Sequence, residues 1–72
     1  MKTELATATV HRLLVKAGAG RVGDDAVEEL RKVLEEIAFR IGKEAIELST
    51  HARRKTVKAG DIRLAVKRVA PE

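Results

Sequence analysis

The sequence predicts an all-α chain in which one long helix is flanked by two shorter ones. An apolar stripe at helical spacing runs through residues 24–52, and a short amphipathic pattern lies on each side of it, over residues 7–17 and 59–69. The two intervening segments are rich in glycine or in basic residues, which is typical of loops. The chain has 72 residues, so we expect a single small domain over residues 1–72.

The first predicted helix covers residues 7–17. Its apolar positions follow the i, i+3, i+4, i+7 pattern and are Val10, Leu13, Leu14 and Ala17. Thr7 is placed to cap this helix, and Gly18 is placed to end it in a left-handed conformation. Arg12 and Lys16 are four residues apart, so they share a face away from the apolar stripe.

A glycine-rich loop follows at residues 18–23, in which Arg21 is the only charged residue. The loop lacks the Lys-Ser/Thr pair of a phosphate-binding loop, and no strand precedes it. We therefore expect its glycines to make a tight turn and to let backbone N–H groups approach an anion.

The long helix, over residues 24–52, is apolar on two sides. Its main stripe consists of Leu30, Leu34, Ile37, Ile41, Ala45, Leu48 and Ala52. Phe39 and Ile46 lie roughly opposite that stripe. Because a helix with two apolar sides must be covered from two directions, we expect an obligate dimer in which long helices cross. The alternative is a monomeric three-helix bundle with a few exposed apolar residues.

Charged residues on the long helix predict pairs four positions apart, including Glu28 with Lys32 and Arg40 with Glu44. Gly42 interrupts the helix with a residue that costs roughly 1 kcal/mol relative to alanine. Either a close helix crossing or simple tolerance would account for it.

The second loop contains the densest basic segment of the chain, Arg53-Arg54-Lys55-Thr56-Val57-Lys58. The third predicted helix, residues 59–69, has apolar positions at Ala59, Ile62, Ala65, Val66 and Val69. Leu64 falls on the opposite side of this helix, with Asp61 nearby.

The distribution of charge indicates a surface for a polyanion. The net charge is +4, but residues 24–52 hold four basic and eight acidic residues, while residues 53–72 hold seven basic and two acidic ones. Such segregation is typical of nucleic-acid binding, although chance clustering in a chain with 36% charged residues is the alternative. The single aromatic residue argues against single-strand binding by base stacking.

Other function classes lose support from the composition. The chain has no cysteine and therefore no disulfide, thiolate metal site or thiolate nucleophile. We also expect no metal and no cofactor. Its apolar runs are too short to span a membrane, and the first residues lack the apolar core of a signal peptide.

Two long segments resemble archaeal histones, as do the shorter Leu34-Glu35-Glu36 and Glu44-Ala45-Ile46, and the similarity covers about residues 5–69. The first is Ala17-Gly18-Ala19-x-Arg21-Val22-x-Asp24-Asp25-Ala26. The second is His51-Ala52-x-Arg54-Lys55-Thr56-Val57-Lys58-Ala59-x-Asp61-Ile62. The resemblance implies a histone fold, in which two chains form a head-to-tail handshake dimer and each first loop lies beside the second loop of the other chain.

The resemblance also implies roles for individual residues. Arg21 would reach the minor groove of DNA and be held by Thr56, and Arg12 would serve a central site formed by the paired first helices. Lys55 and Lys58 would contact phosphates. The resemblance does not assign Lys16 or Arg53, which are added as neighbouring cations. The candidate DNA-binding residues are then Arg12, Lys16, Arg21, Arg53, Arg54, Lys55, Thr56 and Lys58.

By the same resemblance, Arg54 would pair with Asp61 and fix the second loop on the third helix. Contacts between dimers would come from Leu48, His51, Asp61 and Leu64, with a His–Asp hydrogen bond across the interface. The alternative for His51 is a capping contact at the end of the long helix, where a cation is favoured.

Some positions depart from the family pattern. Arg53 replaces the usual glycine after His-Ala, so the end of the long helix is expected to be strained or extended. Lys32 and Arg63 have like charges at places where relatives that stack successive turns pair opposite charges, and Thr50 replaces the usual arginine. These departures favour wrapping of DNA over stacking into long filaments.

The sequence therefore predicts an architectural chromatin protein, not an enzyme, that binds and wraps double-stranded DNA largely without sequence specificity. Its partners would be DNA and itself, as an obligate homodimer or as a heterodimer with a paralogue, with higher assembly on DNA. It would act on the chromosome, in the cytoplasmic nucleoid, without a membrane or a small-molecule substrate. The alternative is a histone-fold subunit of a transcription-factor or centromere-type heterodimer.

Overall fold

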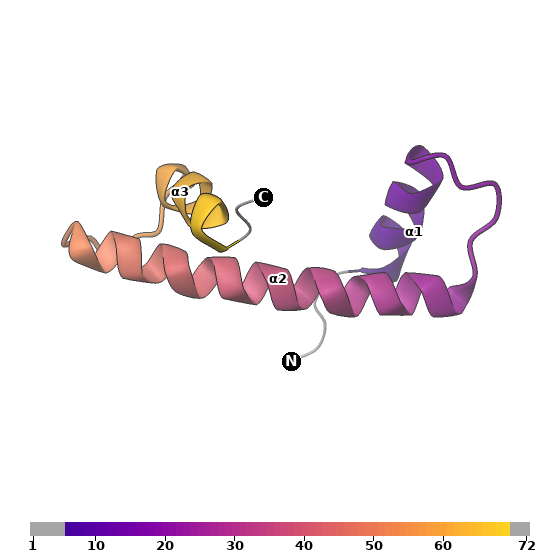
Figure 1. The fold of residues 1–72 in the computed structure, drawn as a ribbon, viewed down its shortest axis with the longest axis horizontal. Coiled ribbons are helices and arrows are strands. Elements are labelled where there is room, and N and C mark those ends of the chain that lie inside the picture. Colours follow the sequence, from indigo (N-terminus) through magenta and orange to yellow (C-terminus); the bar gives the residue numbers. More distant parts are fainter. Residues whose placement is uncertain (1–5, 70–72) are drawn as a thin grey trace. The chain divides into compact units, whose positions relative to one another are not determined.

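The computed structural model describes residues 6–69. Within this range the chain forms three α-helices and no β-strand: α1 (Thr7–Lys16), α2 (Asp24–His51) and α3 (Ala59–Val69) (Figure 1). The predicted all-α class is confirmed. α3 has the bounds that the sequence predicts, and α1 and α2 each end one residue earlier than predicted. The outermost residues of the predicted domain, 1–5 and 70–72, lie outside the described part.

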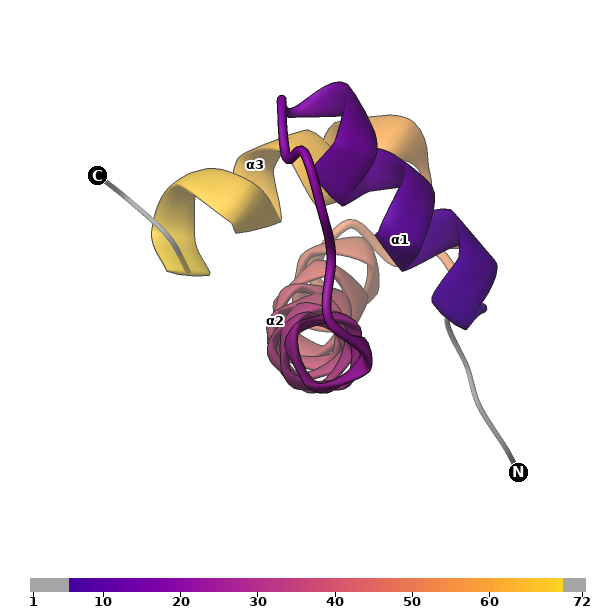
Figure 2. The same cartoon turned by 90° about the vertical axis from the view of Figure 1, so that its right-hand side faces the viewer.

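The chain divides into two compact units, Met1–Glu36 and Ile37–Glu72, and the boundary falls within α2. The first unit contains α1, the glycine-rich loop and the beginning of α2. The second unit contains the end of α2, the basic loop and α3. Each unit thus combines one short helix with its own part of the long helix, which Figure 2 shows nearly along its axis.

The start of α1 differs from the prediction. Thr7 is the first helical residue, and the residue before it, Ala6, has extended backbone and no side-chain capping bond. The Ala6 carbonyl accepts hydrogen bonds from the N–H groups of Thr9 (3.1 Å) and Val10 (3.3 Å). The expectation that Thr7 caps this helix is therefore wrong.

The end of α1 is a Schellman motif built on glycine. Gly18 has a φ of +113°, in the left-handed region that the sequence predicts for it. The Gly18 N–H donates to the Val15 carbonyl (3.0 Å), and the Ala19 N–H donates to the Leu14 carbonyl (3.1 Å). These bonds satisfy carbonyls that the end of a helix otherwise leaves without partners.

The first turns of α2 are stabilised by backbone hydrogen bonds to Gly23 and by the ion pairs of Arg31. Gly23 precedes the helix, and its carbonyl accepts hydrogen bonds from the N–H groups of Ala26 and Val27. Arg31 binds the Glu35 carboxylate at 2.8 Å and also pairs with Glu28. The predicted partner of Glu28, Lys32, is replaced by Arg31, because a planar guanidinium can reach acidic residues on both adjacent turns.

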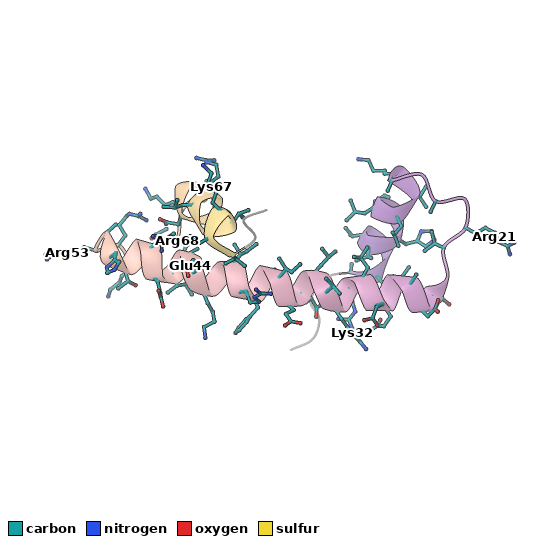
Figure 3. All side chains as sticks on the ribbon, in the orientation of Figure 1. Arg21, Lys32, Glu44, Arg53, Lys67 and Arg68 are labelled. Carbon is teal, nitrogen blue, oxygen red and sulfur yellow. The ribbon has the colours of Figure 1, made fainter. Side chains whose placement is uncertain are left out.

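The second unit has a core of small side chains. Ala45 of α2 and Ala65 of α3 are fully buried. Ser49 is also buried, and its hydroxyl donates to the Ile46 carbonyl at 3.0 Å. At the surface, Arg68 of α3 binds Glu44 of α2 at 2.7 Å (Figure 3), in place of the predicted Arg40–Glu44 pair.

Several large apolar side chains remain exposed in the single chain. The two on the predicted second apolar side of α2 are among the most exposed, with Phe39 at 65% and Ile46 at 54%. The others are Leu13, Val15, Val33, Val57, Ile62, Leu64 and Val66. An isolated copy therefore leaves much of its apolar surface in water, at a cost that covering it would remove.

Candidate nucleic-acid interface

The basic loop begins where α2 ends, in a second Schellman motif. Arg53 has a φ of +62°, and its N–H donates to the Thr50 carbonyl at 2.9 Å. The Arg54 N–H donates to the Ser49 carbonyl at 2.8 Å. Arg53 thus occupies the left-handed position that glycine holds at the end of α1. The expected strain at this helix end is present in the backbone.

Arg54 and Asp61 form an ion pair that joins the basic loop to α3. The Arg54 Nη1 and Nη2 groups donate to the two carboxylate oxygens of Asp61, each at 2.9 Å. Nη1 also donates to the Thr56 carbonyl at 2.9 Å, inside the loop. The Lys58 N–H donates to Asp61 Oδ2 at 2.8 Å, so the carboxylate also caps the start of α3.

These bonds account for the acidity of Asp61. The Arg54 guanidinium and then the Lys58 N–H stabilise the charged carboxylate and lower its pKa to about 2. The same pairing raises the pKa of Arg54. Asp61 is only 7% exposed, whereas the Arg54 side chain is 35% exposed. The hydrogen bonds of the Arg54 guanidinium to Asp61 and to the Thr56 carbonyl occupy it within the protein. This favours a structural role over direct contact with a ligand.

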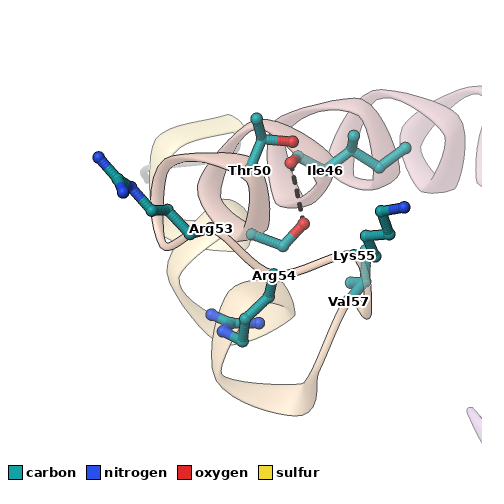
Figure 4. Close-up of a pocket in the computed structure, with 7 residues that line it drawn as sticks. Ile46, Thr50, Arg53, Arg54, Lys55 and Val57 are labelled. Atoms are coloured by element: carbon teal, nitrogen blue, oxygen red, sulfur yellow. Dashed lines mark hydrogen bonds between the residues drawn. The ribbon is translucent and has the colours of Figure 1, made fainter.

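The remaining polar side chains of the loop are free to meet a ligand. Arg53, Lys55, Thr56 and Lys58 are exposed. None of the three cations among them takes part in an ion pair within residues 6–69. An open groove of about 640 Å³ lies beside them (Figure 4), and its walls are Ile46, Ser49, Thr50, Arg53, Arg54, Lys55 and Val57.

The predicted sites of the first unit are also exposed. Arg21 projects from the glycine-rich loop (Figure 3) and has no hydrogen bond or ion pair in the described part of the chain. On α1, Lys16 is exposed, and Arg12 is exposed with only a long hydrogen bond of 3.4 Å to Thr9. Each unit therefore presents cations that its own acidic residues do not neutralise.

The four residues predicted for contacts between dimers all lie in the second unit. His51 and Leu64 are exposed, Leu48 is partly buried and Asp61 is buried. Within the described residues no hydrogen bond joins His51 to Asp61, so the expected His–Asp contact between dimers stays a prediction. The three bonds to Asp61 leave one acceptor position on Oδ1.

Comparison with known proteins gives the family. A family model described as "Histone-like transcription factor (CBF/NF-Y) and archaeal histone" matches residues 3–66. One of the subunits of archaeal histone HAN1, from Thermococcus zilligii, is 56% identical over 64 residues, which cover 89% of this chain and 96% of that protein. Probable archaeal histone 3 of Methanocaldococcus jannaschii is 44% identical over 64 residues, with the same shares of the two chains.

The chain belongs to this family. The histone fold expected from the resemblance is confirmed, and the class is that of DNA-binding chromatin proteins. Two further findings concern membrane-spanning helices and metal sites. No helix among residues 6–69 combines the length and apolarity needed to cross a bilayer. No group of three or more acidic or histidine side chains in that range could hold a metal ion.

Besides the ion pairs of Arg31, two further interactions of this histone-fold chain were not predicted from the sequence. The Arg68–Glu44 bridge joins residues 24 positions apart, so local spacing gives no sign of it. The Lys43 ammonium lies 5.7 Å from the centre of the Phe39 ring, a cation–π contact. The four-residue spacing of Phe39 and Lys43 on a helix was the signal that could have revealed this contact.

Proposed function

We propose that this chain binds and wraps double-stranded DNA, largely without sequence specificity, as dimers that assemble side by side along the duplex. The observation that carries the proposal is the basic loop. There the Arg54–Asp61 pair fixes the backbone, while Lys55 and Lys58 remain exposed and unpaired. Exposed cations on a rigid loop suit phosphate groups, which are at regular positions in every duplex.

The chemistry of the site supports binding that does not depend on base sequence. The exposed cations can bind phosphates, and Arg21 can enter a narrow, electronegative minor groove without reading bases. Asparagine and glutamine, the residues that pair with adenine edges, are absent from the chain. Affinity should therefore depend steeply on salt and weakly on sequence.

The dimer is supported by the apolar surface that one copy leaves exposed. Phe39 and Ile46 remain more than half exposed in the single chain. We propose that a second copy covers the second apolar side of α2, and that the single domain expected over residues 1–72 is completed in this dimer. The arrangement would be the handshake that the family resemblance implies, with each Arg21 held by Thr56 of the other chain.

Side-by-side assembly is supported by the surface around His51 and Leu64. Leu64 is 46% exposed, although its neighbour on α3, Ala65, is fully buried. Asp61 retains one acceptor position, which a His51 N–H from a second dimer could occupy. We propose that these residues and Leu48 form the contact between dimers on the chromosome, in the cytoplasmic nucleoid.

Nuclease digestion of long duplex DNA coated with the protein tests this function. We expect a ladder of protected fragments that grows in equal steps, one for each added dimer. A single short protected fragment would mean that dimers bind without assembling. No protection at low salt, on duplexes of two unrelated sequences, would contradict DNA binding by this chain alone.

The second candidate is a subunit of a heterodimer with another histone-fold chain. The exposed apolar face is compatible with it, because that face needs a partner but does not identify the partner. The Thermococcus zilligii relative is also named as a subunit. Light scattering of the purified chain separates the two proposals. A homodimer supports self-association, whereas an unfolded or aggregated chain that becomes a defined dimer only with a paralogue supports the heterodimer.

A further inference from the structure

Arg53 stands out because it is the only non-glycine residue with a positive φ within residues 6–69. It occupies the left-handed position of the Schellman motif at the end of α2, with a φ of +62°. The equivalent position at the end of α1 is Gly18. The same chain therefore ends one helix with glycine and the other with arginine, although the two backbone motifs are alike.

A left-handed backbone disfavours any residue that carries a Cβ atom. The clash of Cβ with the following carbonyl lowers the folding equilibrium constant about fivefold or more compared with an unstrained position. Glycine avoids this clash, and for this reason it is the usual residue at the left-handed position of a helix end. Arg53 is thus a residue whose backbone opposes folding.

The side chain of Arg53 does not offset that strain within the molecule. Its guanidinium is exposed and has no hydrogen bond or ion pair in the described part of the chain. Figure 4 shows it pointing away from the loop, and Figure 3 shows it projecting beyond the end of α2. The hydrogen bonds of the motif come from backbone N–H groups, which glycine would supply equally well.

Local electrostatics give little reason for a third cation at this position. The carbonyl end of α2 attracts positive charge only weakly at an exposed site. Arg54 and Lys55, which follow directly in the sequence, repel a further positive charge. The nearby carboxylate of Asp61 is already bound by both terminal nitrogens of Arg54.

We propose that Arg53 contacts a DNA phosphate, and that this chain keeps a strained arginine here because glycine could not make that contact. The inference rests on the proposed DNA binding, since the loop that follows presents Lys55 and Lys58 to the same ligand. A guanidinium can bind two phosphate oxygens at once, so an arginine at a fixed helix end adds both charge and geometry. Stability of the free protein is exchanged for affinity.

The experiment compares Arg53→Gly and Arg53→Ala with the parent chain. Urea unfolding at one fixed protein concentration reports stability, and duplex binding over a range of salt reports the phosphate contact. Arg53→Gly should raise the folding equilibrium constant about fivefold because the clash disappears. It should also weaken DNA binding and lower the salt slope by about 0.9 for each lost phosphate contact.

Arg53→Ala separates the backbone effect from the charge effect. It removes the guanidinium but keeps a Cβ atom, so we expect the same loss of DNA affinity without the gain in stability. Arg63→Ala is the matched control, because it removes an exposed cation from α3, where the backbone is helical. It should change neither stability nor the salt slope to a comparable degree.

Each contrary outcome has its own meaning. Parental affinity and salt slope in Arg53→Gly, with weaker binding in Lys55→Ala, would overturn the Arg53 contact and leave the proposed function intact. Failure of the parent itself to bind duplex DNA would overturn both. Lower stability of Arg53→Gly than of the parent would show that the charge of Arg53 stabilises the free protein, and would overturn the exchange of stability for affinity. Equal gains in stability in the glycine and alanine variants would exclude backbone strain as the cause.

Discussion

The guanidinium of Arg54 and the carboxylate of Asp61 form two parallel hydrogen bonds, each 2.9 Å long, between the basic loop and α3. The pair lies at the base of the loop, seven residues apart along the chain, and the Lys58 N–H adds a third bond to the same carboxylate. Because each group satisfies the other, the loop keeps one conformation while its remaining cations face solvent. A structural ion pair thus supports a surface that is otherwise positive.

This pair predicts a specific loss of stability in acid. Asp61 has a pKa of about 2 in the folded chain against an ordinary value of 3.8. Its contribution is therefore fully present above the unfolded-state pKa and is lost as the pH falls from roughly 4 toward the folded-state value. Asp61→Asn should have a Tm several degrees lower than the parent at neutral pH, and the two should converge on acidification. Thermal unfolding across this pH range measures the effect.

Glu47→Gln is the control for this prediction. It removes an exposed carboxylate that forms no ion pair within residues 6–69, so its Tm should follow that of the parent at every pH. A constant difference between Asp61→Asn and the parent, independent of pH, would show that the asparagine acts through packing and would contradict the electrostatic explanation.

The helices were predictable because their stability depends on local patterns. The apolar spacing places all three helices to within one residue of their ends, and Gly18 marks the end of α1 by its freedom to adopt positive φ. The predicted cap at Thr7 was wrong because the helix already includes that residue and uses the Ala6 carbonyl instead. Helix starts with competing polar residues cannot be resolved from sequence alone to one position.

Individual side-chain contacts and site roles were harder to predict from the sequence than the helices. Local spacing could not choose Arg31 over Lys32 as the partner of Glu28, since both lie within about one turn of it. Arg68 and Glu44 meet only because α3 folds back on α2, so no periodicity reports their contact. The roles of Arg21, Lys55 and the other DNA-binding candidates stay predictions, because the contacts within one chain do not report contact with DNA.

Gly18→Ala should destabilise the fold by about 1–2 kcal/mol, because an added Cβ atom clashes at a φ of +113°. Gly20→Ala is the matched control in the same loop. Apart from the adjacent backbone, no atom lies within 4 Å of a Cβ added at either glycine, so the space around them does not distinguish the two. Gly20 has no left-handed φ, and its alanine variant should be neutral or slightly stabilised. Urea unfolding of both variants measures the difference, and equal stability would argue against strain.

Lys55→Ala should weaken binding to all duplex sequences by a similar factor. Lys55 is exposed and has no ion pair among the described residues, so its loss should remove the proposed phosphate contact without disturbing the fold. The slope of log affinity against log salt should fall by about 0.9 per lost contact. Titration of two unrelated duplexes at several salt concentrations measures both effects.

Lys67→Ala serves as the comparison for that loss, because it removes an exposed cation from the far end of α3. We expect a smaller change in salt slope than Lys55→Ala produces. Equal changes in the two variants would mean that net charge, rather than the basic loop, governs affinity. A strong dependence on one base sequence would contradict recognition through phosphates.

Leu64→Arg should leave single dimers bound to DNA while blocking longer assemblies. Leu64 is 46% exposed in the single chain, so arginine there does not create a buried charge in the protomer. Across a contact between dimers the same arginine would face another copy of itself and lose the apolar contact. Nuclease digestion should then give one short protected fragment in place of a ladder. Arg63→Ala, one residue away, should keep the ladder, and an unchanged ladder with Leu64→Arg would place the contact between dimers elsewhere.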